Sequence, residues 1–91
     1  MMRGAVESQS GNSARALENL SAAITVFREL GDTRHEMICL GNMGMVHHRF
    51  GRLEKAVEHY ERGIANVALP QSSRDIFVGN LALANQELGR W

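Results

Sequence analysis

The sequence predicts an all-α fold of antiparallel helix hairpins, and three observations lead to this fold class. Apolar residues recur every three or four positions along most of the 91 residues, which is the spacing of one helix face. No segment alternates apolar and polar residues over a useful length, so no sheet is expected. The connections between the apolar runs are short, and short connections force successive helices to pack antiparallel.

The chain contains an internal repeat, and this repeat orders the helices. Gly11 begins a segment that matches the segment beginning at Gly51, a shift of 40 residues. Leu40 begins a second segment that matches the one beginning at Val78, a shift of 38 residues. The matched apolar positions are three or four residues apart, as on one face of a helix. The change of shift indicates a two-residue deletion near Pro70.

Residues that break helices divide the chain into five elements. Three glycines that end an apolar run are predicted to be helix C-caps in tight turns, namely Gly11, Gly51 and Gly89. Another helix ends before Gly31, after which Asp32 or Thr33 caps the next one. Pro70 precedes the last helix. The expected helices cover residues 2–10, 13–30, 33–50, 53–69 and 73–88.

Small residues alternate with large ones where paired helices must approach closely. They are Gly44 and Ala82 on one type of helix, and Ala16, Ala23, Ala56 and Gly63 on the other. Because glycine inside a helix costs up to about 1 kcal/mol relative to alanine, each such glycine needs a packing reason. We therefore expect close helix contacts at Gly41, Gly44, Gly63 and Gly79.

Composition excludes several classes of function. Ten Lys and Arg balance ten Asp and Glu, so the chain has no electrostatic footprint for nucleic acid. No apolar run approaches the roughly 18 residues of a membrane span, and the first residues lack the apolar core of a secretory signal. The single cysteine excludes an intramolecular disulfide framework and suggests a reducing compartment. We expect a cytoplasmic protein that binds neither nucleic acid nor membrane.

The second repeat resembles a known family. The residues that carry the resemblance are Leu40, Met43, Gly44, His47, Phe50, Gly51, Leu53, Ala56, Tyr60 and Gly63. Together they resemble the tetratricopeptide repeat (TPR) signature, with His47 in place of the usual Tyr and Gly63 in place of the usual Ala. The period of about 40 residues, the LGDTRHE linker and the LGNMG string resemble the longer repeats of kinesin light chain, Pins-type adaptors and bacterial TPR regulators.

The resemblance implies a TPR-like α-solenoid of about two and a half repeats in a single domain over residues 1–91. Residues 1–31 would form a partial first repeat, 32–70 the second, and 71–91 a truncated third. In this family the first helices of successive repeats line a concave groove that binds a peptide or protein segment. An Asn before the small residue of that helix often bonds the ligand backbone, and Asn42 and Asn80 occupy this place.

The expected function is that of a non-catalytic module for protein–protein interaction. The predicted peptide-binding residues lie on helices 33–50 and 73–88, and they are Ile38, Asn42, Met45, His48, Arg49, Asn80, Leu83 and Gln86. The alternatives are that the two Asn residues bond a neighbouring helix or only water, that Met45 and Leu83 pack against the neighbouring helix, and that Arg49 is an ordinary solvated side chain.

The sequence gives little indication of a catalytic site or a metal-binding site. His47 and His48 point about 100° apart on a helix, and no Cys/His spacing typical of a metal site is present. Cys39 has no base at a convincing spacing, and no phosphate-binding glycine motif occurs. We therefore expect no catalytic residues, no metal and no cofactor, and the chain is not expected to be an enzyme.

A second hypothesis is a self-assembling scaffold unit, or a slice of a larger TPR regulatory protein. No following helix is predicted to cover the last one, so an apolar surface would stay open there. A homo-oligomer formed through that end would hide this surface. The predicted self-association residues are Phe77, Leu81, Leu88 and Trp91.

Overall fold

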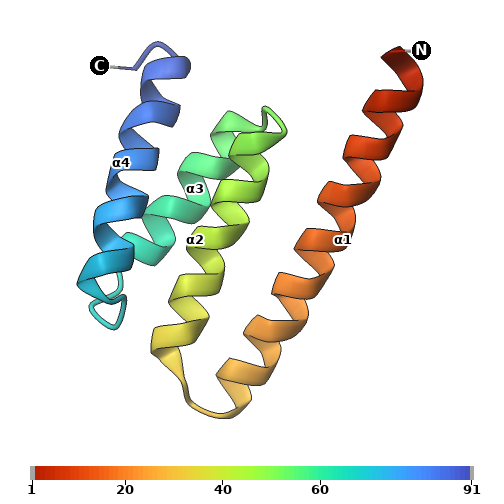
Figure 1. The fold of residues 1–91 in the computed structure, drawn as a ribbon. Helices are drawn as coiled ribbons and strands as arrows, with labels where there is room; N and C mark the ends of the chain where they lie inside the picture. Colours follow the sequence, from red (N-terminus) through yellow and green to blue (C-terminus); the bar gives the residue numbers. More distant parts are fainter. Residues whose placement is uncertain (1, 91) are drawn as a thin grey trace.

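The computed structural model describes the backbone of residues 2–90 and the side chains of residues 11–90. Within this part of the chain it contains the helices α1 (Met2–Glu29), α2 (Thr33–Arg49), α3 (Leu53–Ile64) and α4 (Gln71–Glu87), and no strand. Figure 1 shows α2 between α1 and α4, with α3 behind α2 and α4. The predicted all-α fold class is confirmed, but the described residues form four helices instead of five.

The predicted break at Gly11 is wrong, because α1 runs through this residue without interruption. Gly31, Gly51 and Gly89 have φ angles of +72°, +78° and +79°, whereas Gly11 does not adopt a positive φ. The physical reason is that glycine weakens a helix without forcing it to end. A glycine ends a helix only when the following residues turn back and satisfy its last carbonyls.

The turns at the other three glycines are closed in the same way. In each, the residue after the glycine donates its backbone N–H to a carbonyl in the last turn of the helix. These bonds join Asp32 to Phe27 (2.8 Å), Arg52 to His47 (2.8 Å) and Arg90 to Asn85 (2.7 Å). The predicted C-caps at Gly51 and Gly89 are therefore confirmed, and the left-handed backbone explains why glycine stands there.

The first helix of the second repeat has the N-cap expected from the sequence. The side chain of Asp32 accepts a hydrogen bond from the backbone N–H of His35 at 3.1 Å. This backbone hydrogen bond, together with the His35 ring, holds the pKa of the Asp32 carboxyl below its usual value. A connection of only three residues, 30–32, then brings α2 back along α1.

The third helix ends earlier than predicted, at Ile64 instead of residue 69. Arg74 from the first turn of α4 donates to the backbone carbonyl of Ile64, and also to those of Asn66 (3.0 Å) and Leu69 (3.3 Å). These carbonyls would otherwise lack partners at the end of a helix. The guanidinium therefore holds a compact turn in place of another helical turn.

The core lies where α2, α3 and α4 meet. Ala56 and Tyr60 of α3 are fully buried. A Cβ atom built at Gly44 would come within 2.8 Å of the Tyr60 ring, and one at Gly41 within 2.0 Å of the Phe77 ring. A Cβ at Gly63 would lie 3.3 Å from a backbone carbonyl of α2. The close helix contacts expected at these three glycines are confirmed.

The same expectation is wrong for the fourth glycine. Gly79 is exposed, and a Cβ atom there would meet nothing within 4 Å. Ala82, the other small residue expected at a close contact, is also exposed. Both residues lie on a side of α4 that no described helix covers.

Candidate protein-binding groove

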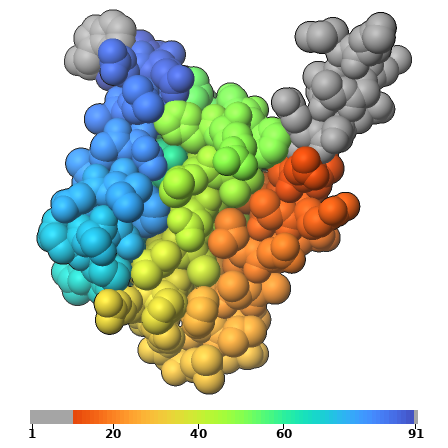
Figure 2. All heavy atoms as spheres, in the orientation of Figure 1, coloured from red at the N-terminus to blue at the C-terminus, as the bar shows by residue number. Residues whose placement is uncertain are grey.

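The concave face predicted from the sequence contains two neighbouring hollows, one on each side of α2. Figure 2 shows this face, with α2 in view between α1 and α4. The α2–α4 hollow has a volume of about 200 Å³ and is lined by Met45, His48, Arg49, Tyr60 and Asn80. The α1–α2 hollow has a volume of about 350 Å³ and is lined by Asn12, Ala16, Leu20, Asn42, Met45, Val46, Arg49 and Phe50. Met45 and Arg49 border both hollows.

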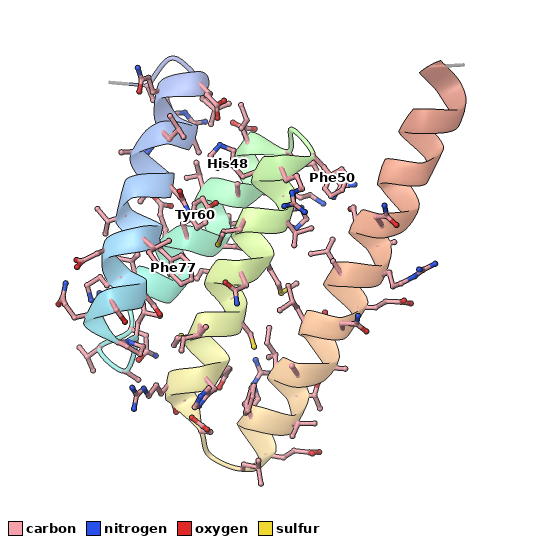
Figure 3. All side chains as sticks on the ribbon, viewed as in Figure 1. His48, Phe50, Tyr60 and Phe77 are labelled. Carbon is pink, nitrogen blue, oxygen red and sulfur yellow. The ribbon has the colours of Figure 1, made fainter. Side chains whose placement is uncertain are left out.

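His48 joins three helices at the α2–α4 hollow (Figure 3). Its Nε2 atom lies 2.6 Å from a carboxylate oxygen of Glu87 on α4, and its Nδ1 atom lies 3.3 Å from the hydroxyl of Tyr60 on α3. A carboxylate can only accept, so Nε2 donates to Glu87, and the Tyr60 hydroxyl can act as donor or acceptor toward Nδ1. Burial raises the pKa of Tyr60 to about 12, which keeps this hydroxyl protonated.

Four of the predicted binding residues line the α2–α4 hollow together: Met45, His48, Arg49 and Asn80. Asn42 instead lines the α1–α2 hollow. The remaining three line neither hollow. Ile38 is half-buried against the core, whereas Leu83 and Gln86 are exposed on α4.

The two Asn residues have their amides available. Both Asn42 and Asn80 are half-buried, and neither amide forms a hydrogen bond to the other side chains that the structure describes. The guanidinium of Arg49 is exposed and forms no ion pair within residues 11–90. Met45 keeps 42 % of its surface exposed. The concave side of α2 thus presents amide, cationic and flexible apolar groups side by side.

Sequence reasoning missed two residues of this site. Tyr60, which the sequence marks only as part of the repeat signature, is buried in the core, and its hydroxyl also reaches the α2–α4 hollow. Glu87 was not among the predicted binding residues although it pairs with His48. Its position is one residue beyond the repeat shift from His48, so a search for acidic hydrogen-bond acceptors near the position one repeat away would have found it.

The structure describes three of the four residues predicted for self-association, and these three lie on the inner side of α4. Phe77 is only 2 % exposed, and its ring stacks on Tyr60 with a centroid separation of 6.0 Å. Leu81 and Leu88 are partly buried and pack against the core. Trp91 lies outside the described residues. Phe77, Leu81 and Leu88 therefore belong to the side of α4 that packs against the core, and a part in self-association stays a prediction.

The remaining nucleophilic and titratable groups are structural in character. Cys39 is buried, and burial raises the pKa of its thiol, which disfavours the reactive thiolate. His47 is also buried, and its ring lies tilted against that of His59, with the ring centroids 5.0 Å apart. Burial, with the nearby cationic side chains, lowers the pKa of His47. Within the part of the chain that the structure describes, no group of three or more His, Cys, Asp or Glu side chains is arranged to hold a metal ion.

Among the residues that were described, none of the helices combines the length and the apolar character needed to cross a bilayer.

Comparison with protein families supports the resemblance carried by the second repeat. A model of the tetratricopeptide repeat matches residues 1–67, which is well over half of the chain. Comparison with curated proteins and with solved structures finds no match. The helix hairpins, the glycine-closed turns and this match agree with one another, and the chain belongs to the tetratricopeptide repeat family.

Proposed function

We propose that the chain is a non-catalytic module that binds an extended segment of a partner protein across α2 and α4. The observation that carries the proposal is the α2–α4 hollow, where Met45 and Arg49 of α2 meet Asn80 of α4. These residues lie one repeat apart in the sequence and form one continuous surface. A role in protein–protein interaction is what membership of the tetratricopeptide repeat family suggests.

The chemistry of this surface suits an extended main chain. An Asn amide supplies a donor and an acceptor, which matches the N–H and C=O of one peptide unit. Met45 and Leu83 are exposed apolar side chains, and the flexible thioether of Met adapts to differently shaped ligand side chains. Arg49 adds a cation for a ligand carboxylate or carbonyl.

The His48–Glu87 contact supports the same function indirectly. At 2.6 Å it ties the C-terminal turn of α4 to α2, on the wall of the hollow. A groove whose walls are held in place loses less conformational entropy when a ligand binds. We therefore propose that His48 has two roles: it lines the hollow, and through Glu87 it holds α4 in position beside α2.

Selection of peptides tests the proposal without a known partner. Peptides would be selected from a random library displayed on phage, and the Kd of the best one would be measured by fluorescence anisotropy. Replacing Asn42 and Asn80 by Ala together is expected to raise Kd at least about tenfold, because it removes up to four hydrogen bonds of roughly 0.5–1.5 kcal/mol each. Alanine is the better helix former, so the double variant keeps its fold.

The matched control is a double replacement on the outer side of α3. Glu58 and Glu61 are exposed and line neither hollow, so changing both to Ala should leave Kd within about twofold. The proposal is overturned if the Asn42 and Asn80 double variant binds the selected peptide as tightly as the original chain.

A further inference from the structure

The contact between α2 and α3 is the template for the inference. On α2 its central residues are Gly41 and Gly44, and on α3 they are Ala56, Tyr60 and Gly63. A Cβ atom at Gly44 would lie 3.2 Å from the Ala56 carbonyl. The small residues let two helices approach closely while Tyr60 fills the space between them. We call these two sets the α2 seam and the α3 seam.

The chain carries a second copy of the α2 seam, and that copy is uncovered. The shift of 38 residues places Gly79 and Ala82 of α4 where α2 has Gly41 and Gly44. Both are exposed, and Val78 beside them keeps 46 % of its surface exposed. The opposite side of α4, with Phe77, is the side that packs on α3.

The chain also carries a second copy of the α3 seam, on α1. The shift of 40 residues places Ala16, Leu20 and Ala23 where α3 has Ala56, Tyr60 and Gly63. Ala16 and Leu20 line the α1–α2 hollow of about 350 Å³, and all three residues are only half-buried. These residues are only half-buried because α1 and α2 diverge toward the N-terminal end of α1, as Figure 1 shows.

We propose that two copies of this chain associate head to tail, with α4 of one copy seated in the α1–α2 hollow of the next. The uncovered seam of α4 would then pack on the uncovered seam of α1 as α2 packs on α3 within each chain. The occupant we propose is a second copy, because the described residues of one molecule leave both halves of one established contact uncovered. This contact is heterologous, so repeated docking gives a ring or an open filament.

Polar residues beside the two seams would also face suitable hydrogen-bond partners in the docked arrangement. The ring of His47 on α2 contacts that of His59 on α3, and the same shifts place Asn85 of one copy opposite Asn19 of the next. Two amides can hydrogen-bond there as donor and acceptor. His48 pairs with Glu87, and the equivalent pair between copies is Gln86 with Arg49, whose guanidinium can donate to the amide oxygen.

This association leaves the α2–α4 hollow of each chain unoccupied, although Met45 and Arg49 also border the α1–α2 hollow. Asn80 lines the α2–α4 hollow within one chain. In the docked arrangement Asn42 has the equivalent position, at the junction between the two copies. The two proposals therefore fail separately: a variant of the α4 seam can lose association and still bind a selected peptide. The inference does not rest on the proposed function.

A disulfide test distinguishes head-to-tail docking from other contacts. In a background with Cys39→Ala, two single variants are made, Ala82→Cys and Ala16→Cys. These positions correspond to Gly44 and Ala56, and a Cβ atom at Gly44 would lie 3.2 Å from the Ala56 carbonyl oxygen, so the two helices pass close to each other at these positions. The equimolar mixture is expected to form a disulfide-linked dimer under mild oxidation, at least about tenfold more than either variant alone. Absence of the dimer in the mixture, or equal yield from Ala82→Cys alone, overturns the proposal.

Measurement of mass in solution provides a second readout. Sedimentation velocity from micromolar to millimolar concentration is expected to show a mass that rises with concentration. Gly79→Arg should keep the chain monomeric, and a Cβ there meets nothing within 4 Å, so the monomer can accommodate it. The control Thr25→Arg, on an exposed side of α1 away from the seam, should associate as the original chain does. A monomer throughout, or association that survives Gly79→Arg, overturns the proposal.

Discussion

The helices α2 and α4 carry nearly the same sequence pattern and have different surroundings. Both contain a Gly-Asn pair followed by Met or Leu and a small residue. Helix α2 packs against neighbours on both sides, whereas one side of α4 is covered by none of the helices that the structure describes. The same position is therefore core in one helix and surface in the other: Gly41 touches Phe77, and Gly79 faces open space.

The comparison shows that a repeat residue acquires its role from its neighbours as well as from its own helix. His48 and Gln86 occupy matching positions, yet only His48 has a helix beside it to contact. The α2–α4 hollow exists because two helices of one type lie next to each other. Variants at matched positions can test this view directly.

Truncation of Phe77, the α4 side chain that packs over Gly41, should lower the stability of the chain more than the other substitutions do. Phe77→Ala is expected to lower the free energy of unfolding by about 3–5 kcal/mol, because it leaves a cavity at the junction of α2, α3 and α4. Urea denaturation followed by circular dichroism measures this change. Val78→Ala, next to it but on the uncovered side, should change stability by no more than about 0.5 kcal/mol. Similar losses in both variants would contradict the burial described for α4.

The two matched glycines should respond with opposite signs. Gly41→Ala forces its new Cβ into the Phe77 ring and is expected to cost about 1–2 kcal/mol after the gain in helix propensity. Gly79→Ala meets nothing and should stabilise the chain by up to about 1 kcal/mol, through helix propensity alone. Thermal unfolding of both variants checks the pair. Changes of the same sign would show that the two helices are more alike than the structure indicates.

His47 should make the stability depend on pH, whereas its counterpart Asn85 should not. Burial lowers the pKa of His47 below its ordinary value of 6.5, so the unfolded chain takes up the proton at higher pH than the folded chain does. The free energy of unfolding should therefore fall as the pH is lowered through about 6.5 toward the folded pKa.

Urea denaturation at a series of pH values measures this dependence. His47→Phe should remove the part of the slope below pH 6.5 that belongs to this group, and Asn85→Ala should leave the slope as it is. An unchanged slope in the His47 variant would mean that another group is responsible.

Loss of the contact between α2 and α4 should have the smallest effect. Glu87→Gln is expected to cost no more than about 1 kcal/mol, because the carboxylate is half-exposed and solvent screens the pair. Amide hydrogen exchange is the sensitive measurement. Faster exchange confined to the last turns of α4 is expected, and faster exchange throughout α1 would contradict a local role for this contact.

Much of the fold could be predicted from the sequence because its causes are local. The turns at Gly51 and Gly89 depend on glycine and on the residue that follows it, and both are visible in the chain. The close contacts at Gly41 and Gly44 follow from the cost of glycine in a helix. Gly11 was misjudged because a glycine inside a helix and one that ends a helix look alike until the turn-closing hydrogen bond is known.

The site was predicted only in part, because its geometry depends on which helices are neighbours. The repeat indicated that Met45, His48, Arg49 and Asn80 share one surface, and they line one hollow. Periodicity could not show that Tyr60, buried in α3, reaches that hollow with its hydroxyl. Nor could it show that the apolar stripe containing Phe77 faces inward, since a helix has the same pattern whichever neighbour it meets.

The central claim is that the concave side of α2 and α4 binds a partner segment. Amide chemical shifts of the labelled chain, recorded while a library-selected peptide is added, test it most directly. We predict shifts that saturate at residues of this side, above all Met45, Arg49, Asn80 and Leu83. Shifts confined to the outer side of α3, around Glu58 and Glu61, with none on α2 or α4, would contradict the claim.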